Sequence, residues 1–452
     1  MLLCPTLRYP DSAKEHVMTG HFQYKVLFLV ALGLICVPSQ CALGSYDYPL
    51  TNPYVATVVG TPSAYGDPLP AQIPERELEL TVFPDRTLPS LLWYNQRLRY
   101  SLVYQEGRAP LVFIIAGAGG SYQSDKTRLL QRILFQAGFH VLALPSPTHP
   151  NFIASASRTQ MPGRPEEDAQ DLYRVMQLAW REVQKEIQVS AFYLIGYSLG
   201  ATHAAFVARS DEQQKVFNFS KVLLINPAVS LYHSAVRLDK LLEQNLPGGI
   251  DDLDRFIEEV FNDLSAAYGR GPAAYERGGF VSLSPDLLYA AYQENHPSNT
   301  RLAALIGLVY RLSSANLAFT SDVLTNAGYI KPKHLTLTVT SSLTDLFEAA
   351  IRMSFLDYFH EILVPYLRSH EPELTQEALI NELSLQSIEG YLRRTQSLVL
   401  MTNADDLILA PEEVGYLHRV FGPRARIYPH GGHCGNMGYR ENVADMLRFL
   451  SH

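Results

Sequence analysis

Cysteine is scarce in this chain of 452 residues, which contains four, at positions 4, 36, 41 and 434. We therefore expect no framework of disulfide bonds, although small secreted proteins often depend on one. The cysteines and the 14 histidines form no cluster with the spacing of metal ligands, so no metal site is expected either.

Basic residues are fewer than acidic ones: the chain has 37 Lys and Arg residues and 45 Asp and Glu residues, which gives a formal net charge of −8. The basic residues form no run. This composition argues against nucleic acid as a partner, since binding to phosphates requires a basic surface. Internal repeats and low-complexity tracts are missing as well, and 47% hydrophobic residues is typical of a globular protein.

Uninterrupted apolar runs are short. None reaches the roughly 18 residues of a membrane-spanning helix, which excludes a multi-pass membrane protein. The twelve residues Val26–Val37 follow Lys25 and precede several small residues, as in the apolar core of a secretory signal. We expect residues 1–44 to be a signal peptide or targeting segment of a secreted or periplasmic protein, with no stable transmembrane span after cleavage. An uncleaved anchor and a buried apolar segment are the alternatives.

Strand and helix patterns alternate through most of the remaining chain. Residues 45–75, rich in Tyr, Pro, Thr and Gly, predict an extended lead-in. Strand patterns follow at 78–83, 98–104, 111–115, 139–144, 192–195, 221–225, 397–401 and 426–428, and helix patterns at 126–137, 166–189, 201–209 and 442–450. Such alternation predicts an α/β fold, a mostly parallel twisted sheet with helices on both faces.

This alternation is interrupted over residues 229–395, where the patterns are mainly helical. They occur at 253–268, 302–319, 346–367 and 377–392, and one short alternating stretch, 335–339, predicts a strand. We interpret 229–395 as a large, mainly helical cap inserted into an α/β core formed by 76–228 and 396–452. The core is then the size of one ordinary α/β domain.

The strongest chemical signal is Gly196-Tyr-Ser198-Leu-Gly200, set between a buried strand pattern and an Ala-rich helix pattern. A serine on such a tight strand-to-helix turn projects its Oγ from the edge of the sheet, and flanking glycines avoid collisions within the turn. The helix that begins at Leu199 aims its free N–H groups at the position of an oxyanion. The pattern predicts Ser198 as a nucleophile, and a Gly-rich turn needed only for packing is the alternative.

A serine nucleophile needs a base and an orienting acid, which should follow the later strands of the sheet. Strand 397–401 leads into a turn with Asp405 and Asp406, and strand 426–428 leads into a Gly-rich loop with His430 and His433. The spacing after the strand favours Asp406 over Asp405, which could instead hydrogen-bond within the turn. His433 follows two glycines that leave the loop free to place an imidazole, and it is favoured over His430.

An oxyanion hole requires two backbone donors. One should be the N–H of Leu199, and the other should come from the run of small residues 116–120, which follows strand 111–115. We expect the N–H of Ala118, with Gly119 as the alternative. The run lacks the lysine and the spacing of a phosphate-binding P-loop.

Taken together, these motifs resemble those of the α/β-hydrolase superfamily: GYSLG at 196–200, AGAGG at 116–120, NADD at 403–406 and GGHCG at 431–435. The segments NADDLILAPEE and PHGGHCG look like the ending of a group of single-domain esterases, although Leu407 stands where those proteins have proline. The resemblance implies an α/β-hydrolase fold with Ser198 as nucleophile, His433 as base and Asp406 as acid.

The chemistry predicted by these residues is cleavage of a carboxylic ester through an acyl-enzyme intermediate, without metal or organic cofactor. The cap is rich in Tyr and Phe, which favours a small-molecule or lipid ester with a hydrophobic acyl or alkyl part. There are two alternatives: a peptidase or amidase with the same triad, and a catalytically inactive binding protein on a hydrolase fold.

Overall fold

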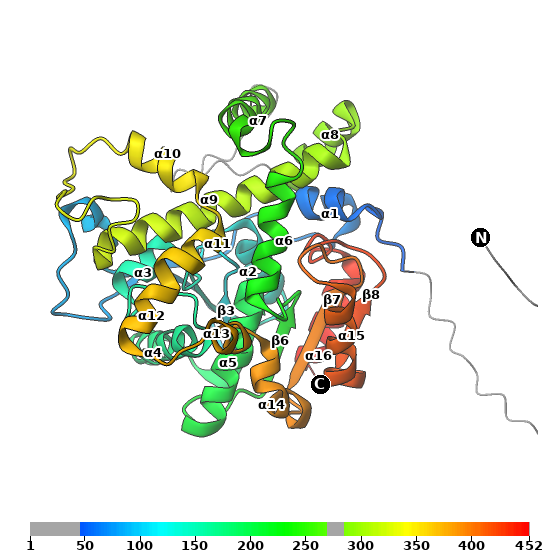
Figure 1. Cartoon of the computed structure of the whole chain (residues 1–452). Coiled ribbons are helices and arrows are strands. Elements are labelled where there is room, and N and C mark those ends of the chain that lie inside the picture. The colour runs from blue at the N-terminus through cyan, green and yellow to red at the C-terminus, as the bar shows by residue number, and fades with distance from the viewer. Residues whose placement is uncertain (1–45, 269–283, 452) are drawn as a thin grey trace, which may run out of the picture. The chain divides into compact units, whose positions relative to one another are not determined.

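The protein is built around an eight-stranded sheet with the strand order β1-β2-β4-β3-β5-β6-β7-β8 (Figure 1). The computed structural model describes residues 46–268 and 284–451, so the predicted targeting segment lies outside the described residues. The strands are β1 (Glu75–Leu80), β2 (Leu98–Val103), β3 (Ala109–Ile115), β4 (His140–Leu144), β5 (Val189–Tyr197), β6 (Lys221–Ile225), β7 (Leu398–Asn403) and β8 (Ala425–Tyr428). Strand β2 is antiparallel to both of its neighbours, β1 and β4. The other neighbouring pairs in the series β4-β3-β5-β6-β7-β8 are parallel. The carboxyl ends of these parallel strands therefore meet at one edge of the sheet.

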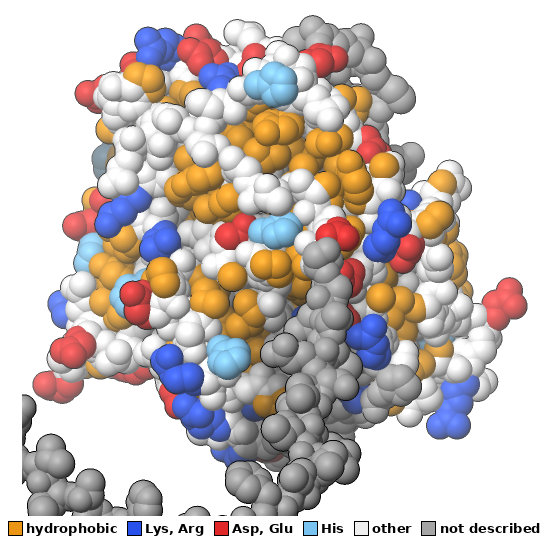
Figure 2. Space-filling view, turned by 90° about the vertical axis from the view of Figure 1, so that its right-hand side faces the viewer, with side chains coloured by type: hydrophobic (Ala, Val, Ile, Leu, Met, Phe, Trp, Pro, Cys, Tyr) orange, Lys and Arg blue, Asp and Glu red, His pale blue; other side chains and the backbone are white. Residues whose placement is uncertain are grey.

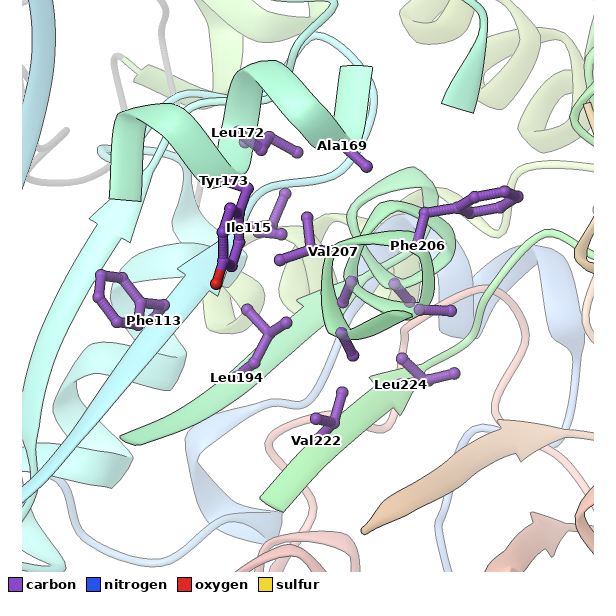
Figure 3. Close-up of a cluster of buried hydrophobic side chains, with 14 of the residues drawn as sticks. Phe113, Ile115, Ala169, Leu172, Tyr173, Leu194, Phe206, Val207, Val222 and Leu224 are labelled. Carbon is purple, nitrogen blue, oxygen red and sulfur yellow. The ribbon is translucent and has the colours of Figure 1, made fainter. Parts of the chain in front are cut away.

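Helices cover both faces of the sheet, as the alternating pattern predicts. The helices of this core are α2 (Asp125–Gln136), α4 (Pro165–Val183), α5 (Leu199–Gln214), α14 (Glu389–Arg394), α15 (Pro411–Phe421) and α16 (Arg440–Ser451). On one face, Phe113 and Ile115 of β3 pack with side chains of α4 and α5, among them Leu172 and Val207 (Figure 3). The alternate residues of β3 point to the other face, where α2 and α16 cover them. The predicted fold class, including helices on both faces, is confirmed.

A block of helices separates β6 from β7 in the chain and has a hydrophobic core of its own. Its helices are α6 (Leu231–Glu243), α7 (Leu253–Tyr268), α8 (Pro285–Asn295), α9 (Asn299–Thr325), α10 (Thr344–Arg352), α11 (Phe355–Asp357), α12 (Val364–His370) and α13 (Gln376–Glu382), with a π-helical turn at Tyr358–Leu363. In this cap a buried ion pair joins Arg311 of α9 to Asp239 of α6 at 3.3 Å. The long helix α9 crosses the cap (Figure 1) and, through Ser313, contacts the core at Gly119.

Helix α9 has an apolar composition that packing explains. Among the described helices it is the one whose length and hydropathy would suit a membrane span, and slightly more than half of its apolar window is buried within the protein. Its neighbours include α6, α10 and α3 (Pro150–Ser155).

On the side of the molecule shown in Figure 2, Lys and Arg side chains are scattered among acidic ones rather than gathered in a patch.

Four local predictions are wrong. The pattern at 377–392 is not one helix, because α13 ends at Glu382 and α14 begins at Glu389. Residues 335–339 are not a strand, because only Leu337 is buried and Leu335 and Val339 face solvent without a neighbouring strand. The pattern at 346–367 is not one helix, because Met353 is extended and Ser354 caps a new helix. The lead-in 45–75 is not extended throughout, since it contains α1 (Pro53–Val59), which Asn52 caps by accepting hydrogen bonds from the first turn.

Candidate active site

The candidate nucleophile stands at the corner between β5 and α5. Ser198 has φ 54° and ψ −129°, a backbone conformation that non-glycine residues seldom adopt and that costs roughly 1–3 kcal/mol. Its backbone N–H donates to the carbonyl oxygen of Ile225 at 2.9 Å, which ties the corner to the end of β6. The sharp change of direction holds the Ser198 side chain at the carboxyl edge of the sheet.

The glycines on either side of Ser198 are required by close backbone contacts. A Cβ atom on Gly196 would lie 2.0 Å from the carbonyl oxygen of Gly200, and one on Gly200 would lie 2.2 Å from that of Ile115. Both distances are far inside van der Waals contact, and the atoms concerned belong to the buried backbone, which cannot rotate away. The G-x-S-x-G spacing is therefore a steric requirement of this corner.

The carboxyl ends of β5, β7 and β8 bring three polar side chains into one line of hydrogen bonds. His433 Nε2 lies 2.8 Å from Ser198 Oγ, and His433 Nδ1 lies 2.9 Å from Asp406 Oδ1. The Asp406 side chain is fully buried, whereas 16% of the His433 side chain is exposed. When Nδ1–H donates to the carboxylate, Nε2 is left to accept the hydrogen of the serine hydroxyl. These are the three residues that the sequence analysis selects for the triad.

Asp405 has a different position from its neighbour. Its carboxylate accepts hydrogen bonds from the backbone N–H groups of Gly431 and Gly432, at 3.2 and 2.9 Å. Burial raises the pKa of Asp405 above its ordinary value, and the two amide donors act in the opposite direction. Asp405 thus holds the loop that carries His433, rather than bonding only within its own turn.

The Asp406 carboxylate has two further donors, one of which the sequence analysis missed. Asn226 Nδ2 donates to Asp406 Oδ2 at 2.8 Å, and the Ile408 N–H donates to Oδ1 at 3.1 Å. Asn226 directly follows β6 and is buried. A polar residue at the carboxyl end of a strand next to β7 was the available signal. These donors orient the carboxylate toward the imidazole.

The pKa of His433 reflects two opposing effects. Burial alone would lower it, but the adjacent Asp406 carboxylate and the Cys434 side chain together outweigh burial and raise the pKa of His433 above its ordinary value. A general base must be neutral to accept a proton, so the raised pKa moves the acid limb of any pH–activity profile to higher pH. Activity that depends on His433 as a base is lost as the pH falls through this pKa.

The loop 116–120 lies directly beside Ser198. A Cβ atom on Gly117 would lie 3.1 Å from Ser198 Cβ. The N–H of Gly119 donates to Thr148 Oγ1 at 2.9 Å, whereas the N–H of Ala118 has no protein acceptor among the described residues. Leu199 is the first residue of α5, so its N–H has no acceptor within the helix. Of the two loop amides that the sequence suggests, Ala118 is therefore the one left for an oxyanion.

The remaining His and Cys candidates lie outside the line of hydrogen bonds. His430 Nε2 donates to the carbonyl oxygen of Tyr48 at 2.7 Å, and His203 is buried beside Asp168 at 3.4 Å. Cys434 is a buried free thiol whose Sγ lies 4.0 Å from His433 Nε2. Within residues 46–268 and 284–451, no group of His, Cys, Asp and Glu side chains is arranged to hold a metal ion.

The order in which the serine, the acid and the histidine follow the strands of the sheet identifies the fold. The serine corner follows β5, the acid follows β7 and the histidine follows β8, in a sheet where β2 alone runs against the other strands. The chain has the α/β-hydrolase fold. This α/β-hydrolase core carries its cap between β6 and β7 in the chain.

The known proteins to which this chain is similar are solved structures of low sequence identity. No protein-family model matches the chain, and no curated protein has a significantly similar sequence. Among solved structures, an esterase from Rhizomucor miehei is 12% identical, with 89% of this chain and 97% of that one covered and a TM-score of 0.41. A proline iminopeptidase from Mycobacterium smegmatis is 12% identical (83% and 98% covered, TM-score 0.37), and a bacterial membrane phospholipase A is 14% identical (88% and 88% covered, TM-score 0.40).

Proposed function

We propose that the protein is a serine hydrolase that cleaves a carboxylic ester with a hydrophobic acyl or alkyl part. The observation that carries the proposal is the 2.8 Å contact between Ser198 Oγ and His433 Nε2, backed by the 2.9 Å contact between His433 Nδ1 and Asp406. An ordinary serine hydroxyl is a weak nucleophile, and an aligned imidazole–carboxylate pair is the arrangement that activates it.

The first half of the proposed reaction forms an acyl-enzyme. Ser198 Oγ attacks the ester carbon while His433 Nε2 takes the hydroxyl proton, and Asp406 stabilises the imidazolium that results. The N–H groups of Leu199 and Ala118 hold the oxygen of the tetrahedral intermediate. When the intermediate collapses, the bond to the alcohol breaks and His433 gives its proton to the leaving oxygen.

The second half releases the acyl group. His433 takes a proton from a water molecule, which attacks the same carbon, and the oxyanion forms again at the same two N–H groups. Collapse of this intermediate returns the proton to Ser198 Oγ and frees the carboxylic acid. Every step uses side chains and backbone of this chain, and no cofactor is required for the proton transfers.

An exposed valine on the cap supports a hydrophobic substrate. A Cβ atom on Gly119 would lie 2.8 Å from Ser313 Cβ, so this side of α9 rests on the loop beside the oxyanion amide. Val309 lies one turn before Ser313 on the same face, and 59% of it is exposed although neighbouring Leu308 is buried. Exposed valine in the middle of a long helix beside the site would be covered by an apolar part of the substrate.

We expect Val309→Asp to lower kcat/KM for a decanoyl p-nitrophenyl ester by roughly tenfold relative to the acetyl ester, since burial of about two methylene groups would be lost. The matched control is Val216→Asp, because Val216 is also an exposed valine, 47% exposed, and follows the far end of α5. Initial rates over a series of acyl chain lengths measure the ratio. An unchanged ratio in Val309→Asp would contradict the placement of the hydrophobic part along α9.

The acidic residues of the cap give little support to a peptidase that grips a free amino terminus. Arg352 pairs with Asp254, and Arg301 pairs with Glu259 at 3.0 Å. Arg255 pairs with Asp252 at 2.6 Å. These carboxylates are therefore already neutralised by arginines of the cap itself. The ester remains the better substrate class on these grounds.

The direct test of the proposal is labelling of the purified chain with a fluorophosphonate, followed by mass mapping of the modified peptide. Such reagents react with an activated serine hydroxyl, so we expect one adduct, on Ser198. Acyl and aminoacyl chromogenic substrates, assayed side by side, then separate esterase from peptidase activity. A folded wild-type chain that takes no label would contradict the proposal and favour the binding-protein alternative.

We also propose that the protein acts outside the cytoplasm, as a secreted or periplasmic protein. The support is the predicted signal peptide within residues 1–44, whose apolar core precedes small residues. Determination of the amino-terminal residue of the protein recovered from its native source tests this directly. A mature chain that retains the apolar run would contradict cleavage.

A further inference from the structure

Helix α1 lies against the loop that carries the candidate base. The helix is only seven residues long, Pro53–Val59, and it begins at Asn52, whose side chain accepts from the N–H groups of Tyr54 and Val55 at 3.0 and 3.3 Å. It belongs to a segment far from the triad in the chain, since 376 positions separate Thr57 from His433. The contact between them is therefore entirely a product of the tertiary structure.

Thr57 makes a hydrogen bond to the backbone of His433 itself. Its Oγ1 accepts from the His433 N–H at 2.9 Å and donates to the carbonyl oxygen of Pro53 at 2.6 Å. The second bond fixes the direction of the hydroxyl, so a lone pair points at the His433 N–H. The backbone of His433 is thus hydrogen-bonded to a side chain of α1.

The two surfaces fit without space for side chains. A Cβ atom on Gly432 would lie 2.3 Å from the carbonyl oxygen of Pro53, and one on Gly435 would lie 2.2 Å from that of Ala56. The glycines around His433 therefore serve a second purpose besides freedom of the loop: they allow α1 to approach it. A displacement of α1 would leave this part of the loop without its support.

Residues on both sides of α1 strengthen the same contact. The Tyr48 hydroxyl hydrogen is shared between the carbonyl oxygens of Gly60 and Gly435, at 2.9 and 3.1 Å, and Thr61 Oγ1 donates to the carbonyl oxygen of Gly435 at 2.9 Å. His430 Nε2 donates to the carbonyl oxygen of Tyr48. The lead-in and the histidine loop thus share hydrogen bonds from 430 to 435.

The opposite side of α1 contacts the cap. Val55, Ala56 and Val59 share a hydrophobic cluster with Leu302 of α9, and side chains of α8 pack onto it. Asn52 Nδ2 donates to Asn299 Oδ1 at 2.7 Å. Hydrophobic side chains gather in the upper half of the molecule's face where α1 and α8 lie (Figure 2). Helix α1 therefore lies between the histidine loop and the cap.

We propose that Thr57 is a positioning residue for His433, so that α1 is a working part of the hydrolase site rather than a lead-in to the fold. The inference rests on the proposed function. Its cause is geometric: proton transfer requires His433 Nε2 to face Ser198 Oγ while Nδ1 faces Asp406, and small displacements from such an alignment reduce the rate steeply.

The test compares Thr57→Val with Thr57→Ser. Valine keeps the branched shape of threonine but neither accepts from the His433 N–H nor donates to Pro53, whereas serine keeps the hydroxyl. We expect Thr57→Val to lower kcat roughly tenfold with KM little changed, and Thr57→Ser to restore most of the loss. Because Asp406 raises the pKa of His433, a loosened loop should also move the acid limb of kcat/KM to lower pH.

The matched control is Thr375→Val, since Thr375 Oγ1 also accepts a backbone N–H, that of Ala378 at 3.1 Å, but within the cap. It should lose stability without a change in kcat or pH profile. Thr57→Ala, which adds no bulk, serves if the valine variant does not fold. Wild-type kcat and pH profile in Thr57→Val, or equal losses in the Ser and Val variants, would overturn the inference.

A readout without turnover separates this inference from the proposed function. The imidazole of His433 can be titrated by NMR in wild type and Thr57→Val, and we expect a lower pKa in the variant. An unchanged titration would overturn the positioning role even if the protein hydrolyses no ester. If wild type takes no fluorophosphonate but the His433 titration still differs between wild type and Thr57→Val, only the proposed function is contradicted.

Discussion

Replacement of Ser198 by alanine is expected to lower kcat for ester hydrolysis by about 10⁶-fold, and His433→Ala should cost nearly as much. The two side chains act as one unit, because Ser198 Oγ and His433 Nε2 share a single hydrogen bond of 2.8 Å. Once either partner is missing, the other has no further step to accelerate. The double variant should therefore be no slower than either single variant.

This prediction is checked by single-turnover and steady-state rates with a short acyl ester, together with fluorophosphonate labelling. Thermal unfolding shows whether each variant folds as the wild type does. Residual rates above the uncatalysed reaction are expected from the Leu199 and Ala118 amides alone. Losses that add up in the double variant would contradict a shared mechanism and point to independent roles for the two residues.

Asp406→Asn should lower kcat by about 10⁴-fold while the protein remains folded. An asparagine amide would present a donor to His433 Nδ1, which favours the tautomer with the proton on Nε2 and leaves that nitrogen unable to accept from Ser198. Asn226 Nδ2 donates to Oδ2 and the Ile408 N–H donates to Oδ1, so an amide, which has only one oxygen, leaves one of these two donors without its acceptor.

Asp405→Asn is the control for this experiment, because the two acids are adjacent and only one contacts His433. Asp405 accepts from the Gly431 and Gly432 amides, so its replacement should cost about 1 kcal/mol of stability and reduce kcat by less than about tenfold. Rates and unfolding midpoints of the two variants give the comparison. A larger loss of kcat in Asp405→Asn than in Asp406→Asn would reverse the assignment of the acid.

Much of the site could be predicted from the sequence because its requirements are local. A serine between two glycines, a buried strand before it and a helix after it are all imposed by one corner of the backbone, as the contacts of Gly196 and Gly200 demonstrate. The acid and the histidine could be located because each follows a strand whose apolar residues are recognisable, and parallel strands end at the same edge.

Tertiary contacts decided which of two adjacent residues takes each position in the site. Asp405 and Asp406 differ only in the direction of their side chains, one to the Gly431–Gly432 backbone and one to His433. Gly119 gives its N–H to Thr148, whereas the N–H of Ala118 has no protein acceptor among the described residues. A pattern of residue types cannot express such choices, because they depend on angles set by distant elements.

By itself, then, the sequence determined an α/β core with a helical insertion, the serine corner and the two loops that carry Asp406 and His433. Those features follow from periodicity and steric limits within short segments. The tertiary structure decided that α1 supports His433 and that Asn226 orients Asp406, 180 positions away. Contacts of this kind leave no local pattern in the chain, because hydrogen-bond donors and acceptors far apart in sequence meet only when the sheet and cap have assembled.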